Sequence, residues 1–231
     1  MIVSINQPAY LPWLGYFERI ARSDVHIVLD HVQVEKNSFT NRNKVRTATG
    51  WCWLTVPMKT KGRFGDLAIR SVEIEGEAWR RKHWETIRQS YARAPFFDVH
   101  APAFEALYAR DWTHLLGVCD AATRLLLDVL GIRTRLLRSS EMEPQGAKDA
   151  LVLDLCRKAG ATTYLSGALG RQYLHEEVFA ESGIRVAYQD YEHPVYPQAH
   201  PGFEPFMAAV DLLFNCGPDA HAILSRGQGG R

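Results

Sequence analysis

The sequence predicts an α/β fold, in which helices flank a mostly parallel sheet, with a small antiparallel excursion and an inserted helical region. The chain opens with a short apolar run over 2–5, a helical pattern over 11–21 and a second β-rich run over 25–29. A strand, a helix and a strand in this order predict two parallel strands. From residue 134 onward, strand and helix patterns alternate again, as they do in parallel α/β sheets.

Residues in the N-terminal part of the chain support the first strands and the first helix of this prediction. Asn6-Gln7-Pro8 ends the first strand, and Pro12 suits the first turn of the helix that follows. Between 32 and 57, β-forming residues are separated by polar breaks, which predicts an antiparallel hairpin with its turn near 48–50. Residues 67–74 alternate imperfectly and predict one further strand.

Helical patterns dominate the middle of the chain. The spacing of apolar residues predicts helices over 77–92, 102–109 and 113–130, and Gly131 follows the last one at the position of a C-terminal cap. The later patterns predict strands over 134–137, 162–165 and 184–188 and helices over 147–159, 172–182 and 203–214. We expect one domain over 1–216, with 77–131 inserted into it, and a flexible glycine-rich tail over 217–231.

Composition excludes several classes of protein. The 231 residues are 46% hydrophobic and carry a net charge of +1, which is ordinary for a globular protein and indicates no nucleic-acid partner. No apolar run approaches about 18 residues, and the N-terminus lacks signal-peptide features, so we expect a cytoplasmic protein without a membrane span. The cysteines and histidines form no metal or redox motif, and no cofactor follows from the sequence.

Local charge is more informative than net charge. Between residues 35 and 63, seven cations stand against the single acid Glu35; the cations are Lys36, Arg42, Lys44, Arg46, Lys59, Lys61 and Arg63. A basic stretch suits a small anionic substrate with a phosphate or carboxylate group. The alternative is a solvated face that acids elsewhere in the fold balance.

Three polar segments are expected at one edge of the sheet, because open α/β sheets bind ligands beyond the carboxyl ends of their strands. They are residues 6–10 after the first strand, Asp30 with His31 and Gln33 after the second, and 166–170 between a later strand and helix. Glycines in 166–170 would let backbone N–H groups and a helix N-terminus approach an anion. The same turn also occurs for packing alone, and it is not a P-loop because no Gly-Lys-Ser/Thr follows.

The first seventeen residues carry a family resemblance. The run Gln-Pro-Ala-Tyr-Leu-Pro-Trp-Leu-Gly-Tyr-Phe over 7–17 is similar to the opening signature of the WbqC-like protein family. The resemblance continues over nearly the whole chain, through segments 23–24, 29–33, 36–37, 41–43, 53–57, 91–95, 130–132, 139–140, 164–167 and 211–215.

The resemblance implies a transferase without naming its substrate. Members of the family are similar to one another across surface-polysaccharide (O-antigen) and amino-sugar gene contexts, and some resemble acyl or aminoacyl transfer partners. Many relatives carry His where this chain has Asn6 and Asn where it has Ala9, so a mechanism that needs a histidine base there does not apply. The order of elements also resembles nucleotidylyltransferase-like domains, without their histidine pair; that likeness concerns the fold alone.

Our first hypothesis is therefore a transferase that acts on a nucleotide-linked sugar or on a carrier-bound acyl or aminoacyl group. Lys36 and Arg42 would hold the anionic part of the substrate, and Gln7, Asn41 and Asn43 would orient the acceptor through hydrogen bonds. Asparagines are also common in turns for their own local hydrogen bonds. The second hypothesis is a non-catalytic module that binds a nucleotide or carrier, and the third is a structural scaffold.

Asp30 is the candidate general base, because its carboxylate leaves the core at the end of an apolar strand. It could equally be an ion-pair partner or a turn cap. The candidate substrate-binding residues are Gln7, Tyr10, Gln33, Lys36, Asn41, Arg42, Asn43, Ser166 and Gly167.

Overall fold

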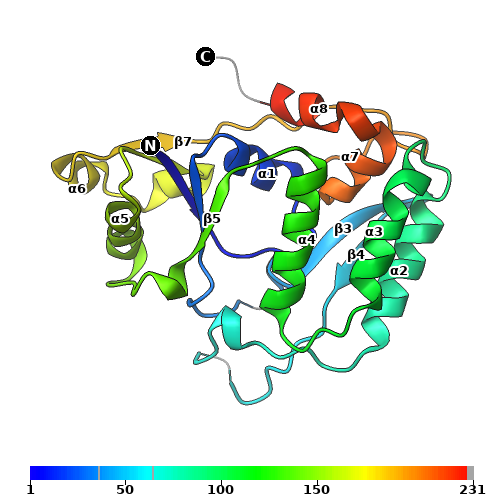
Figure 1. Ribbon diagram of the computed structural model, residues 1–231, viewed down its shortest axis with the longest axis horizontal. Helices are drawn as coiled ribbons and strands as arrows, with labels where there is room; N and C mark the ends of the chain where they lie inside the picture. The colour runs from blue at the N-terminus through cyan, green and yellow to red at the C-terminus, as the bar shows by residue number, and fades with distance from the viewer. Residues whose placement is uncertain (36, 64, 228–231) are drawn as a thin grey trace.

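Five parallel strands form the central sheet of the computed structural model, which describes residues 1–35, 37–63 and 65–227 (Figure 1). The strand order is β5-β2-β1-β6-β7, and the strands are β1 (Ile2–Asn6), β2 (Val25–Val28), β5 (Arg135–Arg138), β6 (Thr163–Ser166) and β7 (Arg185–Tyr188). The chain winds outward from β1 in both directions, so the sheet is doubly wound and its order reverses between β1 and β6. The predicted α/β fold with a mostly parallel sheet is confirmed.

The alternation of side chains along β1 assigns its two faces. Val3 and Ile5 are buried with apolar residues of β2 and of helix α5 (Lys148–Ala159). Ser4 points to the other face, where its hydroxyl contacts His26 Nδ1 at 2.8 Å and Ser23 Oγ at 2.8 Å beside helix α1 (Leu14–Ala21). Parallel sheets are covered on both faces, but here the face toward α1 contains buried polar groups.

The predicted antiparallel hairpin is also confirmed. It consists of β3 (Arg42–Thr47) and β4 (Gly50–Thr55). Its inner face packs into a large core with the helices α2 (Ala78–Tyr91), α3 (Phe97–Ala109), α4 (Leu115–Val129) and α7 (Ala209–Cys216) (Figure 1). None of the described helices has both the length and the apolar character to cross a bilayer.

Two predictions in the middle of the chain are wrong. Residues 67–74 form no strand but a single 3-10 turn, η1 (Ile69–Ser71), with isolated bridges on either side. Their apolar side chains are individually buried in the core. Their backbone, however, makes only isolated bridges and no continuous hydrogen-bond ladder with a neighbouring strand. Helix α3 begins at Phe97 rather than at Pro102, because Phe97 and Phe104 both pack against Phe214, with ring centroids 5.2 and 5.3 Å apart.

The C-terminal elements differ from the prediction in length and place. The helix expected over 172–182 is divided into the 3-10 helix η3 (Ala168–Gln172) and the short helix α6 (Glu176–Glu181). Helix α7 starts at Ala209, six residues later than expected, because Pro205 and the left-handed Phe206 (φ +60°) precede it.

The tail predicted to be flexible from residue 217 contains structure. The 3-10 turn η4 (Gly217–Asp219) leads into helix α8 (Ala220–Arg226), whose Ile223 and Leu224 are buried in the large core. Residues 228–231, with the Gly-Gly-Arg end, lie outside the described residues. The apolar pair 223–224, which the glycine-rich composition obscures, explains why this helix docks.

Replacing Leu224 by alanine tests whether α8 contributes to the fold. We expect the free energy of unfolding to fall by about 2–4 kcal/mol, because a fully buried leucine leaves a cavity when it is truncated. Urea denaturation of the variant measures this, with Val195→Ala at a 77% exposed valine as the control. Equal stability of the two variants would show that α8 is dispensable.

Candidate functional site

A cleft lies along the carboxyl edge of the parallel sheet. It comprises three adjoining cavities of about 360, 620 and 820 Å³. Gln7, directly after β1, and Tyr173, after η3, line all three of them. The cleft therefore lies where the strand order reverses, which is where doubly wound sheets bind their ligands, and its cavities have the size of small-molecule sites.

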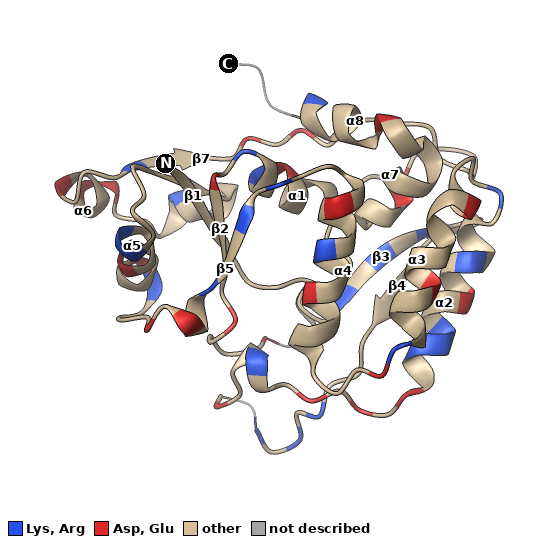
Figure 2. Ribbon diagram, in the orientation of Figure 1, with Lys and Arg blue, Asp and Glu red and all other residues tan. Residues whose placement is uncertain are grey.

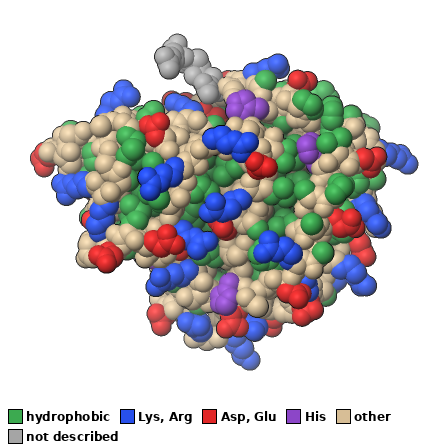
Figure 3. Space-filling view, viewed as in Figure 1, with side chains coloured by type: hydrophobic (Ala, Val, Ile, Leu, Met, Phe, Trp, Pro, Cys, Tyr) green, Lys and Arg blue, Asp and Glu red, His purple; other side chains and the backbone are tan. Residues whose placement is uncertain are grey.

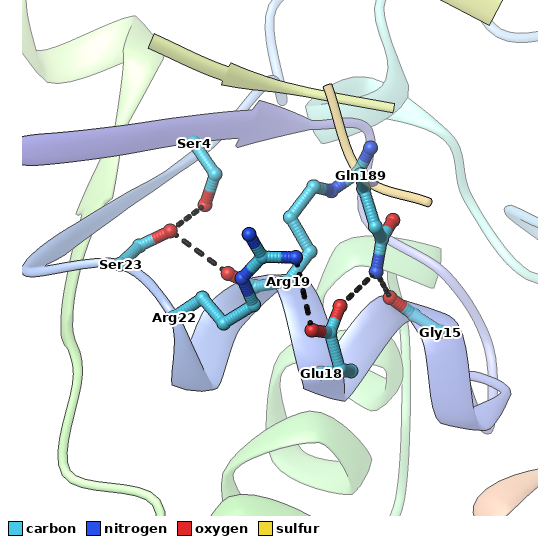
Figure 4. Close-up of polar contacts among 7 residues, drawn as sticks. All are labelled: Ser4, Gly15, Glu18, Arg19, Arg22, Ser23 and Gln189. Atoms are coloured by element: carbon cyan, nitrogen blue, oxygen red, sulfur yellow. Dashed lines mark hydrogen bonds and ion pairs between the residues drawn. The ribbon is translucent and has the colours of Figure 1, made fainter. Parts of the chain in front are cut away.

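Arg19 supplies the charge of the 620 Å³ cavity. Its side chain leaves α1 toward Gln189 and the end of β1, and Figure 4 draws no interaction from its guanidinium. Nε is buried without a hydrogen-bond partner, and no guanidinium nitrogen of Arg19 forms a hydrogen bond or ion pair with the described residues. Burial lowers the pKa of Arg19 below its ordinary value. A half-buried cation without a partner is costly for a fold to keep.

The neighbouring acid, Glu18, forms no ion pair with Arg19. The carboxylate of Glu18 is buried, and it pairs with Arg22 at 3.3 Å and accepts a hydrogen bond from Gln189 Nε2 (Figure 4). Gln189 Nε2 also donates to the carbonyl of Gly15 at 2.7 Å. Glu18 thus holds α1 to the end of β7, and its charge is balanced by a different arginine.

The phenols and the imidazole nearest to Arg19 are neutral. Burial raises the pKa of the phenols of Tyr16, Tyr164 and Tyr173, so these side chains carry no charge near pH 7. Burial and the charge of Arg19 lower the pKa of His26 to about 3, which keeps this imidazole neutral as well. Glu35, an exposed residue, is the acid that lines this cavity. Arg19 and Glu35 are therefore the charged residues that line this cavity.

The loop after β6 fits closely around the guanidinium. A Cβ at Gly167 would overlap Nη1 of Arg19, although the backbone at Gly167 is ordinary, with φ −69°. Ser166 is buried and donates a hydrogen bond to the Gly167 carbonyl at 3.1 Å. The α-helix expected to follow this loop is instead the five-residue η3, so the charge at this site comes from Arg19 and not from a helix end.

Three of the sequence candidates lie in this cleft, namely Gln7, Ser166 and Gly167. The Oε1 atom of Gln7 accepts a hydrogen bond of 3.4 Å from Thr40 Oγ1, and its Nε2 has no partner among the described residues. Gln7 is thus oriented and still able to donate a hydrogen bond to a ligand.

The structure places Asp30 away from the cavity that holds Arg19. Its Oδ1 accepts hydrogen bonds from Ser139 Oγ (3.0 Å) and Ser140 N (2.9 Å), and its Oδ2 accepts one from Ser140 Oγ (2.7 Å). The carboxylate is buried and ties the end of β2 to the end of β5. These contacts favour the structural alternative over the general base.

Two further candidates also lie within the framework of the fold. The Tyr10 hydroxyl is buried against His83 Nδ1 (2.8 Å) and Tyr108 (2.6 Å). Gln33 bridges two backbone groups, because its Oε1 accepts from Leu67 N at 2.8 Å and its Nε2 donates to the Val34 carbonyl at 3.1 Å. Neither side chain lines the cleft.

The Asn-Arg-Asn segment stabilises the hairpin. Asn41 Nδ2 donates to the Val56 carbonyl (2.9 Å) and Asn43 Nδ2 to the Leu11 carbonyl (2.7 Å), and both asparagines are buried. The guanidinium of Arg42 lies 4.3 Å from the centroid of the Trp53 ring, a cation–π contact. Lys36 lies outside the described residues.

The basic stretch does not form one anion-binding patch among the described residues. Figure 2 shows its cations spread along β3 and through the loop at the bottom of the view. Figure 3 shows basic and acidic side chains interspersed on the face of the molecule that is turned toward the viewer. Arg46 is buried and donates to the carbonyls of Thr47, Gly50 and Pro201. The sequence interpretation missed Arg19. This residue lies in α1, and the apolar spacing of that segment indicated only a helix that packs against the core.

The fold and the site together define a doubly wound α/β protein with a ligand-sized, arginine-containing cleft at the switch point of its sheet. The chain belongs to the WbqC-like protein family, whose family model matches residues 7–223. It is 38% identical over 220 residues to "Uncharacterized protein Rv1507c" of Mycobacterium tuberculosis, and the alignment covers 94% of this chain and 95% of that relative. No solved structure matches the chain.

Replacing Asp30 by asparagine tests its structural role. We expect a loss of about 1–3 kcal/mol in the free energy of unfolding, because an amide cannot accept all three hydrogen bonds of the buried carboxylate. Urea denaturation measures the loss, and Asp128→Asn at an exposed ion pair with Arg133 is the control. An Asp30→Asn variant as stable as the parent protein would reopen the interpretation of Asp30 as a base.

Replacing Arg19 by methionine should have the opposite effect on stability. Methionine keeps most of the packing volume and removes a half-buried charge without a partner, so we expect the free energy of unfolding to rise by about 1–2 kcal/mol. A large destabilisation would instead show that Arg19 has a structural partner.

Proposed function

We propose that the protein is a transferase whose donor substrate carries a phosphate or diphosphate group, either a nucleotide-linked sugar or a carrier-bound acyl or aminoacyl group. The unpaired guanidinium of Arg19 at the switch point of the sheet is the observation that carries the proposal. Guanidinium groups bind phosphate oxygens through paired, charge-assisted hydrogen bonds. Both donor types share this phosphate chemistry.

The rest of the cleft suits a donor of this kind. Its cavities extend on both sides of Gln7, so a phosphate at Arg19 leaves room for a further part of the ligand near α5. The free amide nitrogen of Gln7 would donate to that ligand, and the phenol rings of Tyr16, Tyr164 and Tyr173 would surround its phosphate end. The proposed setting in surface-polysaccharide or amino-sugar biosynthesis rests on the family resemblance.

The second candidate is a module that binds the same ligand without turnover. The hydrogen bonds of Asp30 favour it, because they occupy the carboxylate that the sequence suggested as a base. Both candidates need the anion site at Arg19. They differ in whether the cleft contains another group that can accept a proton.

Calorimetric titration with UDP and with inorganic pyrophosphate tests the anion site. We expect the Arg19→Met variant to bind each probe at least about tenfold more weakly, since a charge-assisted hydrogen bond contributes about 1.5–3 kcal/mol. Gly167→Ala should also weaken binding, because its Cβ displaces the guanidinium.

The matched control is Arg133→Met, at an arginine on the surface that is paired with Asp128. It should bind the probes as the parent protein does. If the parent protein binds neither UDP nor pyrophosphate, or if Arg19→Met binds them equally well, the proposed function is wrong.

A further inference from the structure

A histidine–carboxylate pair lies in the 820 Å³ cavity of the same cleft. The pair consists of His175, directly before α6, and Asp149, in the first turn of α5. Nδ1 of His175 and Oδ2 of Asp149 are 2.6 Å apart. Both residues line the cavity together with Gln7 and Tyr173, which also line the cavity of Arg19.

The geometry of the pair selects one tautomer of the imidazole. Because a carboxylate only accepts hydrogen bonds, Nδ1 must carry the proton that it donates to Asp149. Nε2 then has a free lone pair, and it makes no hydrogen bond to any described residue. An imidazole that a carboxylate orients through Nδ1 is the arrangement of a general base.

The carboxylate is itself held in place. Its Oδ1 accepts a hydrogen bond of 3.0 Å from the backbone N–H of Ala150. The preceding residue, Lys148, has the left-handed φ of +53° although it is not a glycine. Sparsely populated backbone conformations of this kind persist where surrounding structure enforces them.

We propose that His175, oriented by Asp149, is the catalytic group of this cleft that accepts the proton of the acceptor substrate. The proposal rests on the proposed function and adds its catalytic group. The acceptor's hydroxyl or amine gives its proton to Nε2 while its oxygen or nitrogen forms a bond to the electrophilic carbon of the donor. The bond between that carbon and the carrier breaks, the carrier leaves with the electron pair, and the proton passes from Nε2 to the carrier or to water.

Charged groups around His175 determine its pH dependence. The hydrogen bond to Asp149, and the nearby charge of Glu177, raise the pKa of His175 above its ordinary value. Glu35, Lys148 and Arg171 also line this cavity, and Arg171 pairs with Asp190 at 3.3 Å. Since the neutral imidazole is the base, reactivity should rise as the pH increases through the raised pKa, and removal of the Asp149 charge should shift that rise to lower pH.

Diethyl pyrocarbonate modifies histidines in their neutral form. Mass spectrometry of peptides then gives the rate of modification of each histidine separately. In the parent protein, UDP at about 100 times its Kd should slow the modification of His175 by about tenfold or more. His114, an exposed histidine whose Nδ1 contacts Thr113, should react equally with and without UDP. In Asp149→Asn, the pH midpoint of His175 modification should fall, whereas in Asp128→Asn it should not.

A nitrogen-15 spectrum of the free protein tests the tautomer without any ligand. We expect a protonated Nδ1 and an unprotonated Nε2 in the neutral form of His175. The opposite tautomer, or modification of His175 that UDP does not slow while UDP still binds, would overturn the role of His175 and leave the anion site intact. Absence of UDP and pyrophosphate binding would overturn the proposed function and this inference together.

Discussion

The parallel pairing of β1 with both β2 and β6 is the constraint on which the rest of the structure depends. Ser4 is paired with His26 on one side and with Leu165 on the other, so β1 has no free edge. At its carboxyl end the chain therefore leaves β1 at the point where the strand order reverses, between the connections that lead to β2 and to β6. Gln7 and the segment that follows it become the floor of a cleft for this topological reason, whatever ligand the cleft takes.

Arg19 shows how this topology creates chemistry from an ordinary helix. Helix α1 packs its apolar side chains into the large core, and its opposite side lies against the polar face of β1. Glu18 and Arg22 form an ion pair across one helical turn, and Gln189 donates a second hydrogen bond to the Glu18 carboxylate. This local network leaves the guanidinium of Arg19 without a hydrogen bond or ion pair from the described residues, at the end of the sheet where a ligand would meet it.

The sequence predicted the parallel sheet and the hairpin, because apolar periodicity and strand order are properties of local patterns. It could not predict the partners of individual polar side chains. Asp30, Asn41 and Asn43 are residue types that are common in binding sites, but their side chains form hydrogen bonds within the fold. Asp30 bonds to Ser140, Asn41 to Val56 and Asn43 to Leu11. These partners lie 15 or more residues away along the chain, so no spacing rule reveals them.

Arg19 and His175 illustrate the converse case. Neither belongs to a motif, and each becomes a candidate only because the fold determines which hydrogen-bonding atoms remain free. The proposed group transfer uses a bound anion at one end of the reacting pair and a proton acceptor at the other. Gln7 and Tyr173 line both cavities, so a single ligand lying across β1 would contact both ends. The two halves of the doubly wound sheet thus contribute separate parts of one site, and neither half could form it alone.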